Sequence, residues 1–294
     1  MCLEKNDHMR NACMKDLEIK THPSIPDRIN YYGQYCGTDK PNLSRLGKAW
    51  WHNYPIHNFN YQFNSWGFRD EDFEQYIGKK VNICLGDSMA VNLGGPIDHS
   101  WPNQLKTYFN IPTLNFGMEA VGNDALNIVY NKLKEIFDIQ NVFVMYSFFH
   151  RRLIDGEFKR NLHCGDQENF DFFLKHRITN AFECALPGWS YSKEEKQFLS
   201  ELEIYFFDTP LYFSNNQEIN RKLIDKDLYN NLRGTDWPTF KQFVQGAEPH
   251  PDMLIKEFGG FVSDKNRDGC HLNYTANSIY ADYLYNQWKQ RNES

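Results

Sequence analysis

The chain has 294 residues, of which 41% are hydrophobic and 24% charged, as in an ordinary globular protein. A formal net charge of −6 excludes the basic footprint of a nucleic-acid-binding protein, so we expect no nucleic-acid partner. The sequence holds no apolar run of about 18 residues and begins without the apolar core of a signal peptide. We therefore expect a cytoplasmic protein without a membrane partner; release by lysis or inclusion in a particle would leave no mark in these features.

The cysteines and histidines suggest neither a disulfide framework nor a metal site. Seven cysteines are scattered without a Cys-x-x-Cys pair, and their odd number argues against a secreted, disulfide-linked protein. They and the ten histidines show no paired ligand spacing, so we expect no metal. The glycines at 117 and 122 lack the spacing of a dinucleotide fingerprint, and we expect no cofactor.

Residues 1–75 are expected to form an N-terminal extension that packs on the core domain, which spans 76–294. Four prolines interrupt any long periodicity before residue 60, and the segment is rich in aromatic residues. Large aromatic side chains are mostly buried, although flat rings could also line a sugar-binding surface. The aromatic residues in question are Tyr31, Tyr32, Trp50, Trp51 and Phe59.

A short apolar run, 81–85, stops abruptly at Gly86-Asp87-Ser88. A run of this length before a glycine is typical of a buried strand. Ser88 would then lie just beyond the carboxyl end of the strand. Reactive side chains and ligands are found at this edge of open α/β sheets.

Helices and strands are expected to alternate after this strand. The expected elements are a helix from Trp101 capped by Ser100 that runs to about Phe109, a strand over 113–116, a helix capped by Asn123 or Asp124, and a strand over 141–147. Alternation of this kind predicts a parallel sheet with helices on both faces. The predicted fold is a three-layer, doubly wound α/β structure of the flavodoxin-like type.

The pattern loosens in the middle part, 153–260, which we expect to be a largely helical insertion. Apolar residues at helical spacing predict helices over 192–207 and 217–232. One or two further strands should lie here, at positions that the pattern does not define. The helices either cover the sheet or form a lid over a substrate. A final helix from about Thr275 is expected to pack on the sheet.

Asp268 and His271 lie just before this final helix, three residues apart. At that spacing both side chains can turn toward one point, where the carboxylate would orient the imidazole. A serine hydroxyl brought to the imidazole would complete a Ser/His/Asp arrangement. A helix-capping turn explains the same two residues without any chemistry. Cys270 between them is interpreted as a packed small residue.

These two blocks together resemble the SGNH, or GDSL-like, hydrolases. Segment 64–70 (Asn-Ser-Trp-Gly-Phe-Arg-Asp) is similar to the Asn-x-x-Gly-Phe-Arg segment of one branch of that family. Segment 115–124 resembles the second block of the branch, Asn-x-Gly-x-x-Gly-x-Gly-x-Asp. The resemblance covers about residues 60–150 and 260–290. It implies an esterase in which Ser88 is the nucleophile, His271 the base and Asp268 the residue that orients it.

The resemblance also indicates where the oxyanion and the substrate would bind. The N–H groups of Ser88 and Ala120 would meet the oxyanion, with alanine standing where the family has glycine. The third block is divergent, because segment 146–152 lacks the Asn that supplies a further donor; Ser147 or His150 could replace it. Asp87, Asn123 and Arg151 are candidates for binding the substrate, although the basic cluster around Arg151 has the composition of a solvated surface.

Two functions follow from these observations. One is hydrolysis of an ester, with an O-acetyl group on a carbohydrate as the substrate that the family suggests. The other is a noncatalytic or weakly active carbohydrate-binding or structural protein on the same fold. The three residues Ser88, His271 and Asp268 favour the enzyme, and the altered third block favours the binding protein. The pattern does not define an oligomeric state.

Overall fold

The structure is a computed structural model that describes residues 28–37, 59–154, 157–159, 165–206, 212–214, 261–263, 271–272 and 274–293. All structural statements refer to these residues. The predicted helix over 217–232 lies outside them, as do Asp268 and Cys270.

Four parallel strands form the central sheet. They are β3 (Lys80–Gly86), β4 (Thr113–Gly117), β5 (Asp138–Tyr146) and β8 (Phe182–Ala185), in the spatial order β4-β3-β5-β8. Every residue of β3 after Lys80 is buried. Continuous burial of this kind, in place of alternation, is what a parallel strand shows when layers cover both faces of its sheet.

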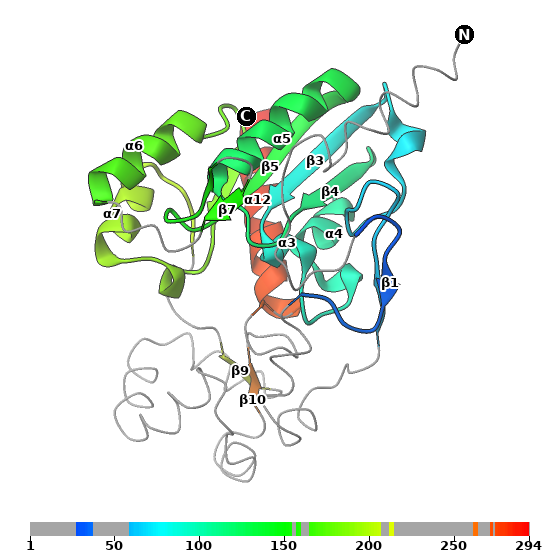
Figure 1. The fold of residues 1–294 in the computed structure, drawn as a ribbon, viewed down its shortest axis with the longest axis horizontal. Coiled ribbons are helices and arrows are strands. Elements are labelled where there is room, and N and C mark those ends of the chain that lie inside the picture. Colours follow the sequence, from blue (N-terminus) through cyan, green and yellow to red (C-terminus); the bar gives the residue numbers. More distant parts are fainter. Residues whose placement is uncertain are drawn as a thin grey trace.

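Helices cover the sheet on both sides. From β3 the chain crosses to β4 through α4 (Trp101–Lys106), then returns past β3 to β5 through α5 (Asn123–Ile136). Because the two crossovers run in opposite directions, right-handed connections place α4 and α5 on opposite faces. The last helix, α12 (Tyr274–Glu293), packs against α4, and Figure 1 shows it passing behind the strands. The strand order confirms the predicted three-layer, flavodoxin-like α/β fold. None of the helices in the described ranges is long and apolar enough to cross a lipid bilayer.

The remaining described elements are short or flank the sheet. Helices α6 (Asp166–His176) and α7 (Lys193–Glu201) lie together at one side (Figure 1). The other elements are α3 (Ser88–Val91), the 3-10 turns η1 (Phe73–Tyr76), η2 (Ile97–His99) and η3 (Gly188–Ser190), and the antiparallel pairs β1 (Tyr32–Gly33) with β2 (Tyr61–Gln62), β6 (Arg152–Ile154) with β7 (Glu157–Lys159), and β9 (Tyr212–Ser214) with β10 (Phe261–Ser263).

The start of α4 agrees with the sequence. The Ser100 side chain accepts a hydrogen bond from the Asn103 N–H at 3.2 Å, as an N-cap serine should. The helix ends at Lys106, however, so Phe109 lies beyond it instead of continuing its apolar stripe. Phe109 packs there against Phe143 of β5 and Trp288 of α12.

The start of α5 differs from the prediction. Gly122 is the N-cap residue, so the prediction that Asn123 or Asp124 caps this helix is wrong. Both side chains are buried and reach the loop after β5: Asn123 bonds to Ser147, and Asp124 Oδ2 accepts from the Leu153 N–H at 2.6 Å. The two side chains therefore bond to the backbone of the loop after β5 and do not act as the N-cap of α5.

The described residues of the middle part contain a strand of the central sheet and a helix that the pattern did not locate, β8 and α6, besides the short strands β7 and β9. Helix α7 begins as expected, after a capping box formed by Ser192 and Glu195, but ends at Glu201 instead of near 207. Glu203 adopts a positive φ of 58°, which takes the chain out of the helical conformation.

The described part of the extension contacts the loop after Ser88. Tyr31 and Phe59 pack on a small cluster formed by Cys36, Tyr61, Phe63, Val91 and Leu93. Tyr32 is 66% exposed, while Trp50 and Trp51 lie outside the described residues. The boundary at residue 75 remains a prediction.

Arg69, from the first family-like segment, fixes the chain that follows α3. Its guanidinium donates to the carbonyl oxygens of Val91 (2.9 Å), Asn92 (2.7 Å) and Gly95 (2.9 Å). Tyr61 covers the guanidinium at 4.2 Å, and the side chain is 1% exposed. These carbonyls lie at and beyond the end of α3, where the helix itself provides no partner.

We expect Arg69→Met to destabilise the fold by about 3 kcal/mol, because it leaves buried carbonyl groups without a charged donor. Thermal unfolding followed by circular dichroism measures the change. Lys289→Met is the control: Lys289 and Glu293 form an exposed pair at 3.6 Å, worth at most about 1 kcal/mol. Equal losses in the two variants would contradict the role given to Arg69.

Candidate active site

Ser88 lies at a sharp turn between strand and helix. Strand β3 ends at Gly86, Asp87 is the N-cap residue, and Ser88 begins α3. The turn is tightly packed: a Cβ added to Gly117, at the end of β4, would lie 2.8 Å from the backbone of Ala90. The glycine thus lets α3 rest directly on the end of the neighbouring strand. Ser88 itself is 9% exposed.

The sheet topology makes this edge the expected ligand site. The chain leaves β3 toward β4 on one side, and later reaches β5 on the other. Ligands of open α/β sheets bind at the carboxyl ends of strands where the order reverses in this way. The loop after β4 joins the site through the Met118 N–H, which donates to the Gly86 carbonyl at 3.0 Å.

Asp87 is held by the loop after β5. Its Oδ1 accepts from the Met89 N–H (3.0 Å), while Oδ2 accepts from Ser147 Oγ and Arg151 Nη1, both at 3.1 Å. The Arg151 guanidinium lies 4.2 Å from the centre of the Phe148 ring. These bonds occupy groups of Asp87 and Arg151 that we assigned to the substrate, and a role of either residue in substrate binding remains a prediction.

Asn123 holds the beginning of the same loop. Its Oδ1 accepts from the Ser147 N–H (2.8 Å), and its Nδ2 donates to the Ser147 carbonyl (3.1 Å). One carboxamide thus satisfies both backbone groups of the first residue after β5. Substrate binding by Asn123 would have to use its remaining amide hydrogen or the second lone pair of Oδ1.

Ala120 has a left-handed backbone, with φ of 59°. It stands where the resemblance expects glycine, the residue that adopts positive φ without steric cost. The loop therefore retains the glycine-like conformation, and alanine is strained in it. Whether the Ala120 N–H meets an oxyanion remains a prediction.

His150 is half-buried beside Phe148, with the two ring centres 5.1 Å apart. Burial, and secondarily the positive charge of Arg151, lower its pKa below the usual 6.5. The imidazole is therefore neutral near pH 7, where one ring nitrogen donates and the other accepts. Its assignment to the oxyanion remains a prediction.

His271 is 7% exposed, and Asn277 links its segment to the serine turn. Asn277 Nδ2 donates to the Leu272 carbonyl (2.9 Å) and to Asn92 Oδ1 (3.2 Å). Asn92 ends the helix that Ser88 begins. The structure thus brings the His271 segment to α3, while Asp268 lies outside the described residues.

Asn277 was not among the predicted site residues, although its position in the sequence indicates a buried polar side chain. It precedes Tyr280 by three residues and Leu284 by seven, which places it on the apolar face of the last helix. A buried asparagine on such a face requires polar partners. Asn277 is completely buried, and its Oδ1 also accepts from the Trp101 N–H at 3.1 Å.

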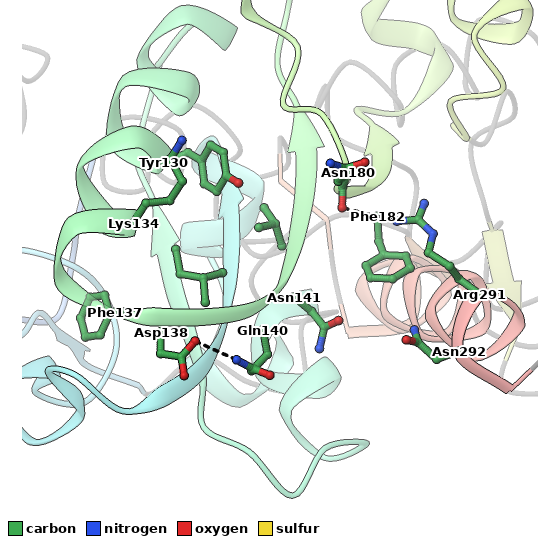
Figure 2. Close-up of a pocket in the computed structure, with 12 residues that line it drawn as sticks. Tyr130, Lys134, Phe137, Asp138, Gln140, Asn141, Asn180, Phe182, Arg291 and Asn292 are labelled. Atoms are coloured by element: carbon green, nitrogen blue, oxygen red, sulfur yellow. Dashed lines mark hydrogen bonds between the residues drawn. The ribbon is translucent and has the colours of Figure 1, made fainter.

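A hollow of about 550 Å³ lies at the other end of the sheet, near the beginning of β5 (Figure 2). The side chains of Lys134 and Arg291 border it, and Arg291 lies over the ring of Phe182 at 4.2 Å. The first five residues of β5 line the hollow and the remaining four run on to the serine edge, so the hollow is separate from the candidate active site.

The sequence matches no protein-family model and no curated protein. Several solved structures are similar in part, among them the following two. The psychrotrophic esterase EstA from Pseudoalteromonas sp. is 12% identical, over 73% of this chain and 99% of its own, with a TM-score of 0.37. A protein of the G-D-S-L family from Desulfitobacterium hafniense DCB-2 is 16% identical, over 70% and 98%, with a TM-score of 0.27.

We expect Ala120→Gly to stabilise the protein by about 1 kcal/mol, because glycine adopts the positive φ without strain. Thermal unfolding measures this gain. Ala125→Gly is the control within α5, where the same change should destabilise by about 1 kcal/mol. A loss of stability in both variants would show that the backbone at 120 is not strained.

The lowered pKa of His150 predicts a loss of stability in acid. Below pH 6.5 the unfolded chain binds a proton at His150 more readily than the folded chain. The neutral His150 therefore contributes to the free energy of unfolding above pH 6.5, and this contribution is lost as the pH falls through the lowered pKa of the folded protein. His150→Gln should therefore lose less stability than the parent between about pH 8 and about pH 5.5. An NMR titration that places the His150 midpoint at or above 6.5 would contradict the prediction.

Proposed function

We propose that this protein is a serine esterase with Ser88 as nucleophile. The observation that carries the proposal is the position of Ser88, on a tight turn at the carboxyl end of the central strand, where the sheet order reverses. Asn277 joins this turn to the segment of a nearly buried histidine. A strand-to-helix turn of this kind presents a nucleophile to a substrate.

In the proposed reaction, Ser88 Oγ attacks the ester carbonyl and gives its proton to His271. The imidazolium then protonates the leaving alcohol, and Asp268 stabilises its charge. Water, activated by the same imidazole, releases the acid and restores Ser88. The backbone N–H groups of Ser88 and Ala120 would receive the oxyanion.

The substrate class that we propose is an O-acetyl ester on a carbohydrate. This choice depends on the family resemblance alone, since the net charge of −6 selects no substrate. Release of acetate from acetylated oligosaccharides would support it. Faster hydrolysis of long acyl esters would favour a lipid substrate instead.

A noncatalytic carbohydrate-binding protein is the second candidate, and the loop after β5 favours it. Of the two residues that could replace the missing Asn, Ser147 already has another partner, because its Oγ bonds Asp87. Without a third donor, hydrolysis would be slower by a factor of about 10²–10³.

We expect Ser88→Ala and His271→Ala each to lower kcat/KM for p-nitrophenyl acetate by about 10³-fold or more. Because the two residues act as one unit, the double variant should be no slower than either single one. Steady-state kinetics on purified protein measure both effects.

Ser200→Ala and His176→Ala are the matched controls. Ser200 Oγ bonds the Lys196 carbonyl within α7, and His176 Nδ1 contacts the Phe172 carbonyl within α6. Both should retain the parent rate. Hydrolysis that is equal in the parent and in Ser88→Ala would refute the esterase and leave the binding protein.

A further inference from the structure

A buried ion pair joins the N-terminal extension to the loop after β4. Arg28 Nη2 lies 2.8 Å from Glu119 Oε1, with the two side chains 2% and 5% exposed. Arg28 precedes the part of the chain that the family resemblance covers. Glu119 immediately precedes Ala120, which has a positive φ of 59°. The backbone N–H of Ala120 is the expected oxyanion donor.

The extension encloses the Glu119 carboxylate closely. Cys36 Sγ lies 3.4 Å from Oε1. A Cβ added to Gly37, which has a φ of 55°, would lie 2.7 Å from Oε2. A backbone without a side chain therefore lies against the carboxylate, and water has little room there.

Arg28 itself depends on this carboxylate. None of its three guanidinium nitrogens meets hydrogen-bond geometry in the described part of the chain, so the contact with Glu119 is an ion pair, and the ring centre of Phe63 lies 5.3 Å from the guanidinium carbon. Each charge thus compensates the other in surroundings of low dielectric. Removing one member of a buried ion pair leaves the charge of the other member uncompensated, which is strongly unfavourable.

The location of the pair has a consequence for catalysis. An uncompensated carboxylate beside the oxyanion loop would oppose the negative charge that develops during ester cleavage. Compensated by Arg28, the same carboxylate instead anchors the loop to the extension. The loop is attached to the sheet by the Met118 N–H, bonded to Gly86.

We propose that Arg28 and Glu119 are positioning residues of the active site, and that the extension through Arg28 both fixes the oxyanion loop and neutralises its charge. The catalytic part of this inference rests on the proposed esterase function. The structural part, that Arg28 holds the loop 118–122, does not.

The test combines kinetics with hydrogen exchange measured by mass spectrometry on the full chain. Arg28→Met should speed exchange in the peptide that contains 118–122, relative to peptides from β3 and β5. It should lower kcat for p-nitrophenyl acetate about 10²-fold with KM little changed, as misplacement of a transition-state donor does.

Adding Glu119→Gln to Arg28→Met removes the uncompensated charge and should restore part of kcat. Arg28→Lys, which keeps the charge, should retain more activity than Arg28→Met.

Arg177→Met is the control, because it breaks another ion pair, with Glu183 on β8, at 2.5 Å. It should change neither exchange at 118–122 nor kcat. If Arg28→Met does not fold, Glu119→Gln carries the test alone: it preserves the shape of the side chain and should also speed exchange at 118–122.

Unchanged exchange at 118–122 in folded Arg28→Met would overturn the inference, as would an unchanged kcat in an enzyme that depends on Ser88. Faster exchange in a protein without Ser88-dependent hydrolysis would support the positioning of the loop by Arg28 and refute only the esterase.

Discussion

The close approach of α3 to the end of β4 is the constraint on which the candidate site depends. Helix α3 has four residues, too few to be stable by its own hydrogen bonds, and must be held by its surroundings. Gly117 allows the backbone of Ala90 to rest on the strand, and Asn115 Nδ2 donates to the Ala90 carbonyl at 2.9 Å. The direction in which Ser88 leaves the sheet is therefore set by the second family-like segment.

Buried polar side chains provide the rest of this support. Asp70, which follows Arg69, accepts from the Asn115 N–H at 2.7 Å and pairs with Lys106 of α4. The first family-like segment thus reaches the end of α3 through Arg69 and strand β4 through Asp70. Such groups are costly to bury unless each has a partner, and their loss leaves uncompensated charges. Each of these side chains has such a partner here: Arg69 has three carbonyl groups, and Asp70 has the Asn115 N–H and Lys106.

The sequence predicted the parts of the fold that repeat a simple pattern. The apolar run 81–85 and the periodic helix after Asn123 were recognisable because burial on both faces, or on one face, leaves a regular trace. Strand β8 has only four residues, and its partner is more than thirty residues earlier in the chain, so local pattern could not locate it. The capping of α5 by Gly122 was not predictable either, since it depends on the hydrogen bonds that Asn123 and Asp124 form with the loop after β5.

The candidate site was predictable only as a list of residues. The motif placed Ser88 at the end of a strand, but the partners of Asp87 come from sixty residues away, and no spacing rule connects them. The pairing of Arg28 with Glu119 was likewise not predictable from spacing, because the two residues are distant in the chain and form a buried ion pair only in the folded protein. Charged residues in a sequence indicate solvent exposure by default.

Segment 146–152, which lacks the asparagine that the family resemblance expects, has a physical explanation in these contacts. In place of a free asparagine amide after β5, this chain has Ser147 and Arg151, which together neutralise and hold the buried Asp87. Asn123, from the preceding helix, then satisfies the backbone that such a loop leaves open. The stabilisation of the serine turn and the supply of an oxyanion donor compete for the same loop, and in this protein the loop bonds to the turn. Any hydrolysis must therefore depend more heavily on backbone donors, which makes the geometry of the loop containing Ala120 decisive.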